Sequence, residues 1–264
     1  MFIVFNKQKI YSYIVALSTV LVLFVISFAL VNNENNIITT SANKKELPIY
    51  SVKTEEKKVA LTLNCAWNAD DIDIILNTLK ENNVKVTFFM VGDWVSKFPE
   101  AVKKISDAGH EIANHSNTHP HVNNLSIEEN VSEIQLCSEK IEKITGKKTT
   151  LYRGPFGEYN NNVIRAAKEA GHTTIQWNID TLDYEGLTST EMWNRIEKNL
   201  NNGSIILMHN GTKNTANSLD TIIKNIKDKG YELVTVSDIS IINELIFKDN
   251  YYIDPNGEQV KLNN

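Results

Sequence analysis

Short runs rich in β-branched and aromatic residues alternate with segments of helical periodicity from Val59 to about residue 240. The run Val84–Val91, Val-Lys-Val-Thr-Phe-Phe-Met-Val, predicts a strand. The preceding stretch Asp70–Asn82 has its apolar residues at helical spacing and predicts a helix. Such alternation is typical of an α/β fold, in which helices connect parallel strands.

The rest of the region continues this alternation. Further strands are predicted at 59–64, 111–114, 150–153, 172–179, 204–208 and 233–236, and further helices at 99–108, 126–146, 160–170, 189–200 and 216–229. Ser126 and Glu129 form a capping-box pattern at the start of the longest helix, and Gly146 marks its end. The pattern predicts a distorted parallel (β/α) barrel of about seven strands. An open doubly wound sheet would give the same pattern.

An apolar run, Ile10–Val31, lies near the N-terminus and is long enough to cross a hydrocarbon core of about 30 Å as a helix. Lys7 and Lys9 precede it, and the next basic residues are Lys44 and Lys45. This asymmetry predicts a cytoplasmic N-terminus with the bulk of the chain outside the cell membrane. The run exceeds the usual apolar part of a signal peptide and ends without a clear cleavage pattern. An uncleaved single-pass anchor is therefore expected, with a cleaved signal peptide as the alternative.

Four regions follow from these patterns: a cytoplasmic stub and transmembrane signal anchor (1–31), a polar linker (32–58), the folded domain (59–240) and a C-terminal tail (241–264). The linker is inferred from an Asn-rich stretch and the absence of sustained periodicity. The net charge of −5 and pI near 5.7 argue against a nucleic-acid partner. Two cysteines do not make a disulfide framework.

Two histidines four residues apart, His115 and His119, follow the predicted strand 111–114. On a helical turn such residues project the same way, so both imidazoles can reach one metal ion. The spacing alone would also fit two unrelated surface histidines. Other polar residues fall at the ends of other predicted strands, namely Asn64, Cys65, Arg153, Asp180, Asp183 and His209. In a parallel barrel those ends share one rim, where catalytic groups gather, so a site is predicted there.

Five stretches, in order along the chain, carry a resemblance to a known family. They are Thr87–Gly92 (TFFMVG), Gly109–Pro120 (GHEIANHSNTHP), Arg153–Gly157 (RGPFG), Trp177–Tyr184 (WNIDTLDY) and Leu207–His209 (LMH). The region from about Val59 to Ile239 resembles the polysaccharide deacetylase domain, also called NodB-homology or carbohydrate esterase family 4. Within that family it is similar to the sporulation-type deacetylases of spore-forming bacteria.

The resemblance implies a metal-dependent hydrolase that removes acetyl groups from N-acetylated sugars of cell-wall glycan, with peptidoglycan as the expected substrate. His115 and His119 would hold a divalent metal, most often zinc, which polarises the amide carbonyl and activates a water. His209, oriented by Asp180, would protonate the departing amine. Arg153 would position the carboxylate base.

The resemblance also implies where the substrate lies. The oxyanion would face the metal and a backbone N–H near Phe156 in the Arg153–Gly157 motif, next to Pro155. Trp67 and Asp183 are further candidates for contact with the substrate. Trp67 could equally serve as packing at the rim of the barrel.

The first family motif departs from the usual pattern. The family has Thr-Phe-Asp-Asp-Gly, with the base first and a metal ligand second, where this chain has Thr-Leu-Asn-Cys-Ala at 62–66. Asn64 has no proton-accepting carboxylate and cannot replace the base directly. Cys65 could bind zinc as a thiolate or be a small buried residue. Asp70, another candidate ligand, opens a helix, where the dipole favours a carboxylate. The base could be Asp183, Asp70 or a metal-bound hydroxide.

Two hypotheses therefore remain. The first is an active cell-surface hydrolase of N-acetylated glycan. The second is a deacetylase-like protein that binds glycan without turnover, because Asn64 stands where the base is expected. The retained His209 and Asp180 favour the enzyme, since a protein that only binds has little need of a general acid.

Overall fold

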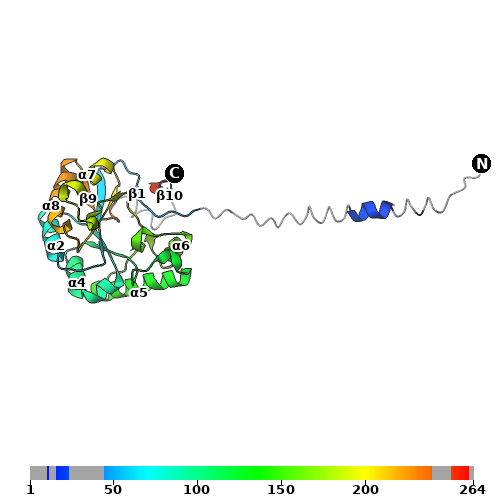
Figure 1. Ribbon diagram of the computed structural model, residues 1–264, viewed down its shortest axis with the longest axis horizontal. Coiled ribbons are helices and arrows are strands. Elements are labelled where there is room, and N and C mark those ends of the chain that lie inside the picture. The colour runs from blue at the N-terminus through cyan, green and yellow to red at the C-terminus, as the bar shows by residue number, and fades with distance from the viewer. Residues whose placement is uncertain (1–10, 12–15, 24–44, 240–250, 262–264) are drawn as a thin grey trace, which may run out of the picture. The chain divides into compact units, whose positions relative to one another are not determined.

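The computed structural model describes residues 11, 16–23, 45–239 and 251–261, in two units that comprise residues 1–44 and 45–264. In the first unit, Tyr11 and residues 16–23 are helical (Figure 1, blue). Among the described residues, no helix has the length and apolar character needed to span a membrane. Most of the apolar run Ile10–Val31 lies outside the described residues, so the membrane anchor stays a prediction.

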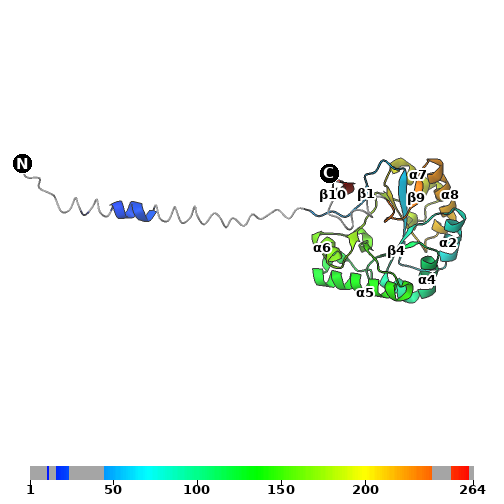
Figure 2. The same cartoon turned by 180° about the vertical axis from the view of Figure 1, so that it is seen from behind.

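A curled parallel sheet forms the centre of the second unit (Figures 1 and 2). Its strands run in the order β6 (Thr173–Thr174), β5 (Leu151–Tyr152), β4 (Glu111–Asn114), β3 (Thr87–Met90), β2 (Lys58–Cys65), β8 (Ile205–His209) and β7 (Ile179–Asp180). The strand β9 (Glu232–Val234) pairs with the first residues of β2. All these pairings are parallel, and the end strands β6 and β7 are not neighbours. The predicted distorted (β/α) barrel is confirmed in the form of an open half-barrel.

Helices surround this sheet (Figures 1 and 2). They are α2 (Ile72–Glu81), α3 (Gly92–Lys97), α4 (Pro99–Asp107), α5 (Ile127–Thr145), α6 (Asn161–Glu169), α7 (Ser189–Asn199) and α8 (Thr215–Asp228). The predicted capping box of α5 is present, with Ser126 and Glu129 each bonded to the other's backbone, and Gly146 ends the helix at φ +69°. The short helix α3 was not predicted.

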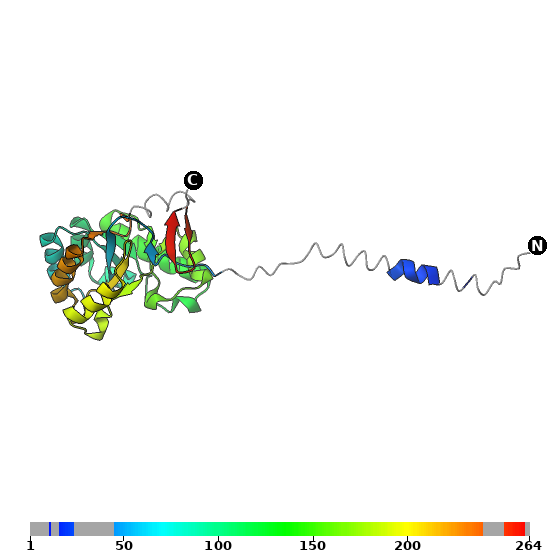
Figure 3. The ribbon, with the colours of Figure 1, turned by 90° about the horizontal axis from the view of Figure 1, so that it is seen from above.

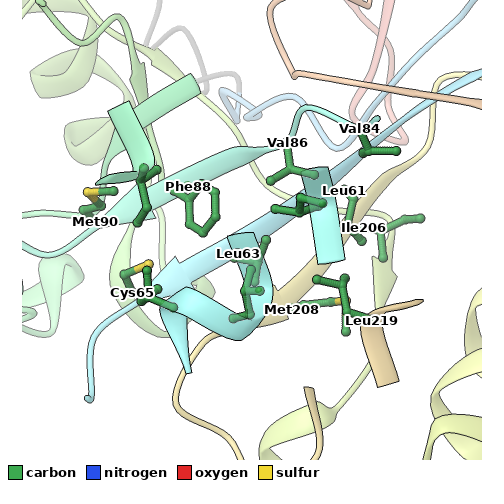
Figure 4. Packing of buried hydrophobic residues seen from close by; sticks show 14 of the residues in the cluster. Leu61, Leu63, Cys65, Val84, Val86, Phe88, Met90, Ile206, Met208 and Leu219 are labelled. Atoms are coloured by element: carbon green, nitrogen blue, oxygen red, sulfur yellow. The ribbon is translucent and has the colours of Figure 1, made fainter. Parts of the chain in front are cut away.

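The alternation of side chains along β2 divides the core in two. Leu61, Leu63 and Cys65 pack in the larger cluster between the sheet and the helices (Figure 4). Ala60 faces the other way and belongs to a second cluster, with Phe89 of β3 and residues of the other strands. Strand residues have a period of two, so Thr62 and Asn64 share the face of Ala60. This parity decides which residues of β2 can reach the site.

The predicted strand 172–179 is wrong as one element, because the structure divides it into β6 and β7. The backbone between them bonds to other partners. The carbonyls of Ile175 and Gln176 accept hydrogen bonds from the Arg153 side chain, and the Gln176 N–H donates to the Ile49 carbonyl. The buried guanidinium interrupts the strand because its donors require acceptors.

The segment expected to be a polar linker up to residue 58 is in part folded. Ile49 and Val52 are fully buried. Strand β1 (Ser51–Val52) pairs in parallel with β11 (Glu258–Lys261), which pairs antiparallel with β10 (Tyr251–Ile253) from the expected tail (Figure 3, red). These strands are too short to show a periodicity, and their pairing joins the two ends of the folded unit.

Gly203 provides a test of how this small sheet docks. It has φ +74°, its carbonyl accepts from the Val52 N–H, and a Cβ there would overlap the Val52 carbonyl. Gly171 has φ +77°, but a Cβ added there would meet no atom within 4 Å, which makes it a matched control. We expect Gly171→Ala to cost about 1–2 kcal/mol of unfolding free energy from backbone strain alone. Gly203→Ala should cost about 1–3 kcal/mol more because of the overlap. Equal losses in urea denaturation would contradict this docking.

Candidate active site

A cleft of about 490 Å³ lies at the carboxyl ends of the central strands. It is lined by seven of the predicted site residues, namely Asn64, Trp67, His115, His119, Phe156, Asp180 and His209. Tyr184, which also lines it, was not singled out from the sequence although it ends one of the five motifs. The predicted site residues at the strand ends therefore come together around one cleft.

His209 is paired with Asp183, and not with Asp180 as expected. Its Nδ1 lies 2.8 Å from the Asp183 Oδ1, and its backbone N–H donates to Oδ2 at 2.6 Å. The Thr215 hydroxyl donates to the same Oδ2 at 2.6 Å. The cause is a tight turn: Leu182 adopts φ +53°, and its N–H bonds to the Asp180 Oδ1. The buried Asp183 carboxylate thus fixes the imidazole and leaves Nε2 as the free ring nitrogen.

Aromatic side chains enclose His209. The Trp67 ring stacks on it with centroids 5.3 Å apart, and Tyr184 meets it edge-on at 5.4 Å. Both aromatic rings remain about half exposed. This arrangement shields the flanks of the imidazole and presents apolar surface at the mouth of the cleft.

Asn64 is bonded to a fully buried guanidinium. Arg153 Nη1 donates to the Asn64 Oδ1 at 2.9 Å and to the Thr62 hydroxyl at 3.0 Å. The charged group also lies over the Phe89 ring, 3.9 Å from its centroid. Burial lowers the pKa of Arg153 to about 9, because removal from water disfavours the charged form. Arg153 lies beside Asn64 as the family pattern implies, but it meets an amide there and not a carboxylate.

His115 and His119 come together as predicted, with ring centroids 5.0 Å apart. They lie on an irregular loop and not on a helical turn. His115 Nδ1 lies 2.7 Å from the Arg153 carbonyl, an acceptor, so this nitrogen carries the proton and Nε2 remains free. Burial lowers the pKa of both imidazoles, which keeps them neutral, the form that binds metals.

Glu133 holds the loop that carries both histidines. Its Oε2 accepts from the Ser116 hydroxyl and from the N–H groups of Asn117 and Thr118, and its Oε1 accepts from the Thr118 hydroxyl. Ser116 and His119 adopt φ +67° and +61°, conformations that need such support. Sequence reasoning missed Glu133, since nothing marks it among the acidic residues of α5.

The two expected candidates for a third metal ligand are both wrong. Cys65 packs in the core between sheet and helices (Figure 4), and burial raises the pKa of its thiol well above the usual range. Asp70 lies in a separate surface groove beside Lys97 and Phe98. Across the described part of the chain, no three His, Cys, Asp or Glu side chains converge on a possible metal position. The described residues therefore offer two imidazoles, one fewer than the three protein ligands usual for catalytic zinc.

The Arg153–Gly157 motif forms one wall of the cleft. Phe156 adopts φ +58° and is 60% exposed, with its ring centroid 4.5 Å from that of His119. Its other neighbour is His121, stacked at 4.4 Å and bonded through Nδ1 to Glu158. Pro155, expected at the substrate site, is buried and is not among the residues that line the cleft. Phe156 therefore presents an exposed aromatic ring on the wall of the cleft.

Known proteins are similar to this chain in sequence and in fold. The family model for polysaccharide deacetylase matches residues 51–175. A peptidoglycan-N-acetylglucosamine deacetylase of Bacillus cereus is 32% identical over 191 residues, which are 71% of this chain and 70% of that protein. The chain belongs to the polysaccharide deacetylase family. The resemblance inferred from the five motifs is thereby confirmed.

Two further proteins are similar to this member of the polysaccharide deacetylase family. The uncharacterized protein YlxY of Bacillus subtilis is 36% identical over 192 residues, 73% of this chain and 60% of YlxY, so the chain spans less than two thirds of that relative. BA3943 of Bacillus anthracis is described as a CE4 family pseudoenzyme, and a mutant of it as having restored enzymatic activity. Both structures are 34% identical with a TM-score of 0.70, and cover 73% of this chain and 68% (wild type) and 70% (mutant) of theirs.

Zinc binding tests the histidine pair. We expect His115→Ala and His119→Ala each to abolish any stoichiometric zinc binding, because each removes one of the two neutral imidazoles that converge. Metal content after equilibrium dialysis, measured by mass spectrometry, would show this. His121→Ala is the control, since that imidazole is held by Glu158. Undiminished zinc in both pair variants would place the metal elsewhere.

Proposed function

We propose that this chain is a de-N-acetylase of N-acetylated cell-wall glycan that hydrolyses the acetamide to a free amine and acetate, with peptidoglycan as its substrate. The observation that carries the proposal is the His209–Asp183 pair on the wall of the cleft. A histidine whose Nδ1 is fixed by a buried carboxylate is a general acid with its Nε2 directed outward.

The pair supplies what amide hydrolysis needs at its second stage. An amine leaves a tetrahedral intermediate only when it is protonated. Nε2 of His209 can donate that proton, while Asp183 stabilises the imidazolium. The donors from Thr215 and the His209 backbone hold Asp183 in place. Trp67 and Tyr184 limit the access of water to the flanks of the ring.

The walls of the cleft support a sugar substrate. Three partly exposed aromatic rings, Trp67, Tyr184 and Phe156, surround its opening. Aromatic faces provide rigid apolar contact area, as the C–H faces of a sugar ring require, and polar groups beside them can fix its hydroxyls. The name of the Bacillus cereus relative supports peptidoglycan as the glycan.

Zinc is the divalent metal we propose for His115 and His119. Neutral imidazole nitrogens suit this ion. The two histidines are the protein ligands that the described residues offer, so oxygen atoms from water or substrate would complete the coordination. The proposed roles of the other residues do not depend on this ion.

A second candidate function is glycan binding without turnover. The specific observation in its favour is Asn64, whose Oδ1 is occupied by Arg153 where a catalytic carboxylate is expected. The incomplete metal ligand set points the same way. BA3943, described as a pseudoenzyme of the same family, supports this candidate as a related chain with a similar fold.

The two functions are separated by acetate release from N-acetylglucosamine oligomers and peptidoglycan, with and without added zinc. We expect measurable release by the wild type and at least about tenfold more by Asn64→Asp, because a base contributes about 10²–10⁴-fold to the rate. Asn124→Asp adds the same charge at an exposed position and is the control. Glycan binding with no acetate release from the wild type would favour the second function, whether or not Asn64→Asp releases acetate.

We also propose that an N-terminal helix anchors the chain in the cell membrane with the cleft outside. The support is the apolar run Ile10–Val31, with Lys7 and Lys9 before it and no further basic residue until Lys44. This location would place the cleft beside the cell wall.

Fractionation tests the anchor. The full-length chain should sediment with membranes, and protease added to intact protoplasts should remove the domain, because it is on the outer face. A mature soluble secreted form that begins near Asn32 would show that the N-terminal segment is a cleaved signal peptide.

A further inference from the structure

The cleft offers a carboxylate that the family pattern does not assign to proton abstraction. Asp180 is the acidic residue among those that line the cleft. The two carboxylates expected as bases from the sequence, Asp183 and Asp70, do not line it. Asp183 is fully buried with three donors on its two oxygens, and Asp70 lies in another groove.

The position of Asp180 follows from the register of the sheet. Asp180 is paired with Leu207 of β8, and Leu207 with Thr62 of β2. Asn64 is paired with His209, two residues further toward the carboxyl ends. Asp180 therefore lies on the cleft face of the sheet, one side-chain layer deeper than Asn64.

Asp180 is held rigidly but keeps one oxygen available. Its Oδ1 accepts the Leu182 N–H at 2.9 Å, and its backbone carbonyl accepts from Arg195 Nε at 2.9 Å. Within the described residues, no donor is within hydrogen-bond distance of its Oδ2. A half-buried carboxylate oxygen that lines a cleft and lacks a protein donor can accept a hydrogen bond from water.

Asp180 also supplies negative charge near the buried cation. Its charge opposes the lowering of the Arg153 pKa that burial causes. In the family pattern the aspartate at the position of Asn64 would supply this charge. Here an amide occupies that position, and Asp180 is the carboxylate that remains near Arg153.

We propose that Asp180 is the general base of this chain, an assignment that rests on the proposed deacetylase function. Oδ2 of Asp180 takes a proton from a water as the water oxygen bonds to the acetamide carbon. The carbonyl electron pair moves to its oxygen. The C–N bond then breaks, and the leaving nitrogen takes a proton from His209 Nε2. Asp180 returns its proton to solvent and His209 recovers one, so that water and amide yield acetate and amine.

The greater depth of Asp180 makes it a less well placed base than a carboxylate at the position of Asn64. Rate falls steeply when a catalytic group is displaced by even about 1 Å. The wild type is therefore a slow enzyme, and a carboxylate introduced by Asn64→Asp takes over the role. Carboxylates at positions 180 and 64 are thus expected to be redundant as bases, so that their effects on the rate do not add.

The test is a cycle of four chains: wild type, Asp180→Asn, Asn64→Asp and the double variant. Asparagine keeps the Oδ1 that accepts the Leu182 N–H, and thermal unfolding confirms the fold of each chain. We expect Asp180→Asn to lower kcat for acetate release at least about 30-fold in the wild type, but less than about threefold in the Asn64→Asp background. Asp70→Asn, at an exposed position before the start of α2, should leave kcat unchanged in both backgrounds.

Rescue by a small acid separates a base from a residue that only positions Arg153. Sodium formate should restore part of the activity of Asp180→Asn, while sodium chloride at equal ionic strength should not. Absence of rescue, or an equal loss in both backgrounds, overturns the assignment. An active wild type with an unaffected Asp180→Asn overturns it while the deacetylase function stands. A wild type that releases no acetate overturns both.

Discussion

The buried guanidinium of Arg153 is the interaction on which the cleft depends. Its side chain donates to Thr62 and Asn64 of β2 and to the carbonyls of residues 175 and 176. Its backbone carbonyl fixes the ring of His115, and its backbone N–H bonds to the Asn114 carbonyl. One residue thus connects the strand that carries the position of the usual base, the histidine loop and the segment before β7. A guanidinium fully removed from water requires hydrogen-bond acceptors. The backbone between β6 and β7 provides two of them, the carbonyls of residues 175 and 176.

The two sides of the cleft differ in how far they retain the chemistry of a hydrolase. On the side of β7 and β8, Asp183 receives three hydrogen bonds and holds the imidazole of His209 in place. On the side of β2, an amide occupies the position of the base, and Cys65 faces the core. Loss of a carboxylate next to a buried guanidinium removes both a proton acceptor and a counter-charge. The fold tolerates this change because an amide oxygen still accepts the guanidinium hydrogen bond.

Support from outside the cleft keeps the histidine loop in place. Glu133 of α5 accepts four hydrogen bonds from residues 116–118, and Ser116 in turn accepts from the His119 N–H. The positive φ angles of Ser116 and His119 would be costly without these partners. The geometry of the imidazole pair is therefore set by a helix that contributes no residue to the cleft.

The sequence by itself determined the α/β class, the parallel arrangement of strands and the set of strand ends where the site lies. Periodicity and caps are local signals, and five short motifs carried the family. It did not determine which aspartate holds His209, because the choice between Asp180 and Asp183 depends on a turn at Leu182 with positive φ. Nor did it show that Cys65 faces the core, that Glu133 holds the histidine loop, or that β1 pairs with β11 across about 200 residues of sequence. Only the tertiary structure decided these points, since each depends on side-chain direction and on contacts between segments far apart in the chain.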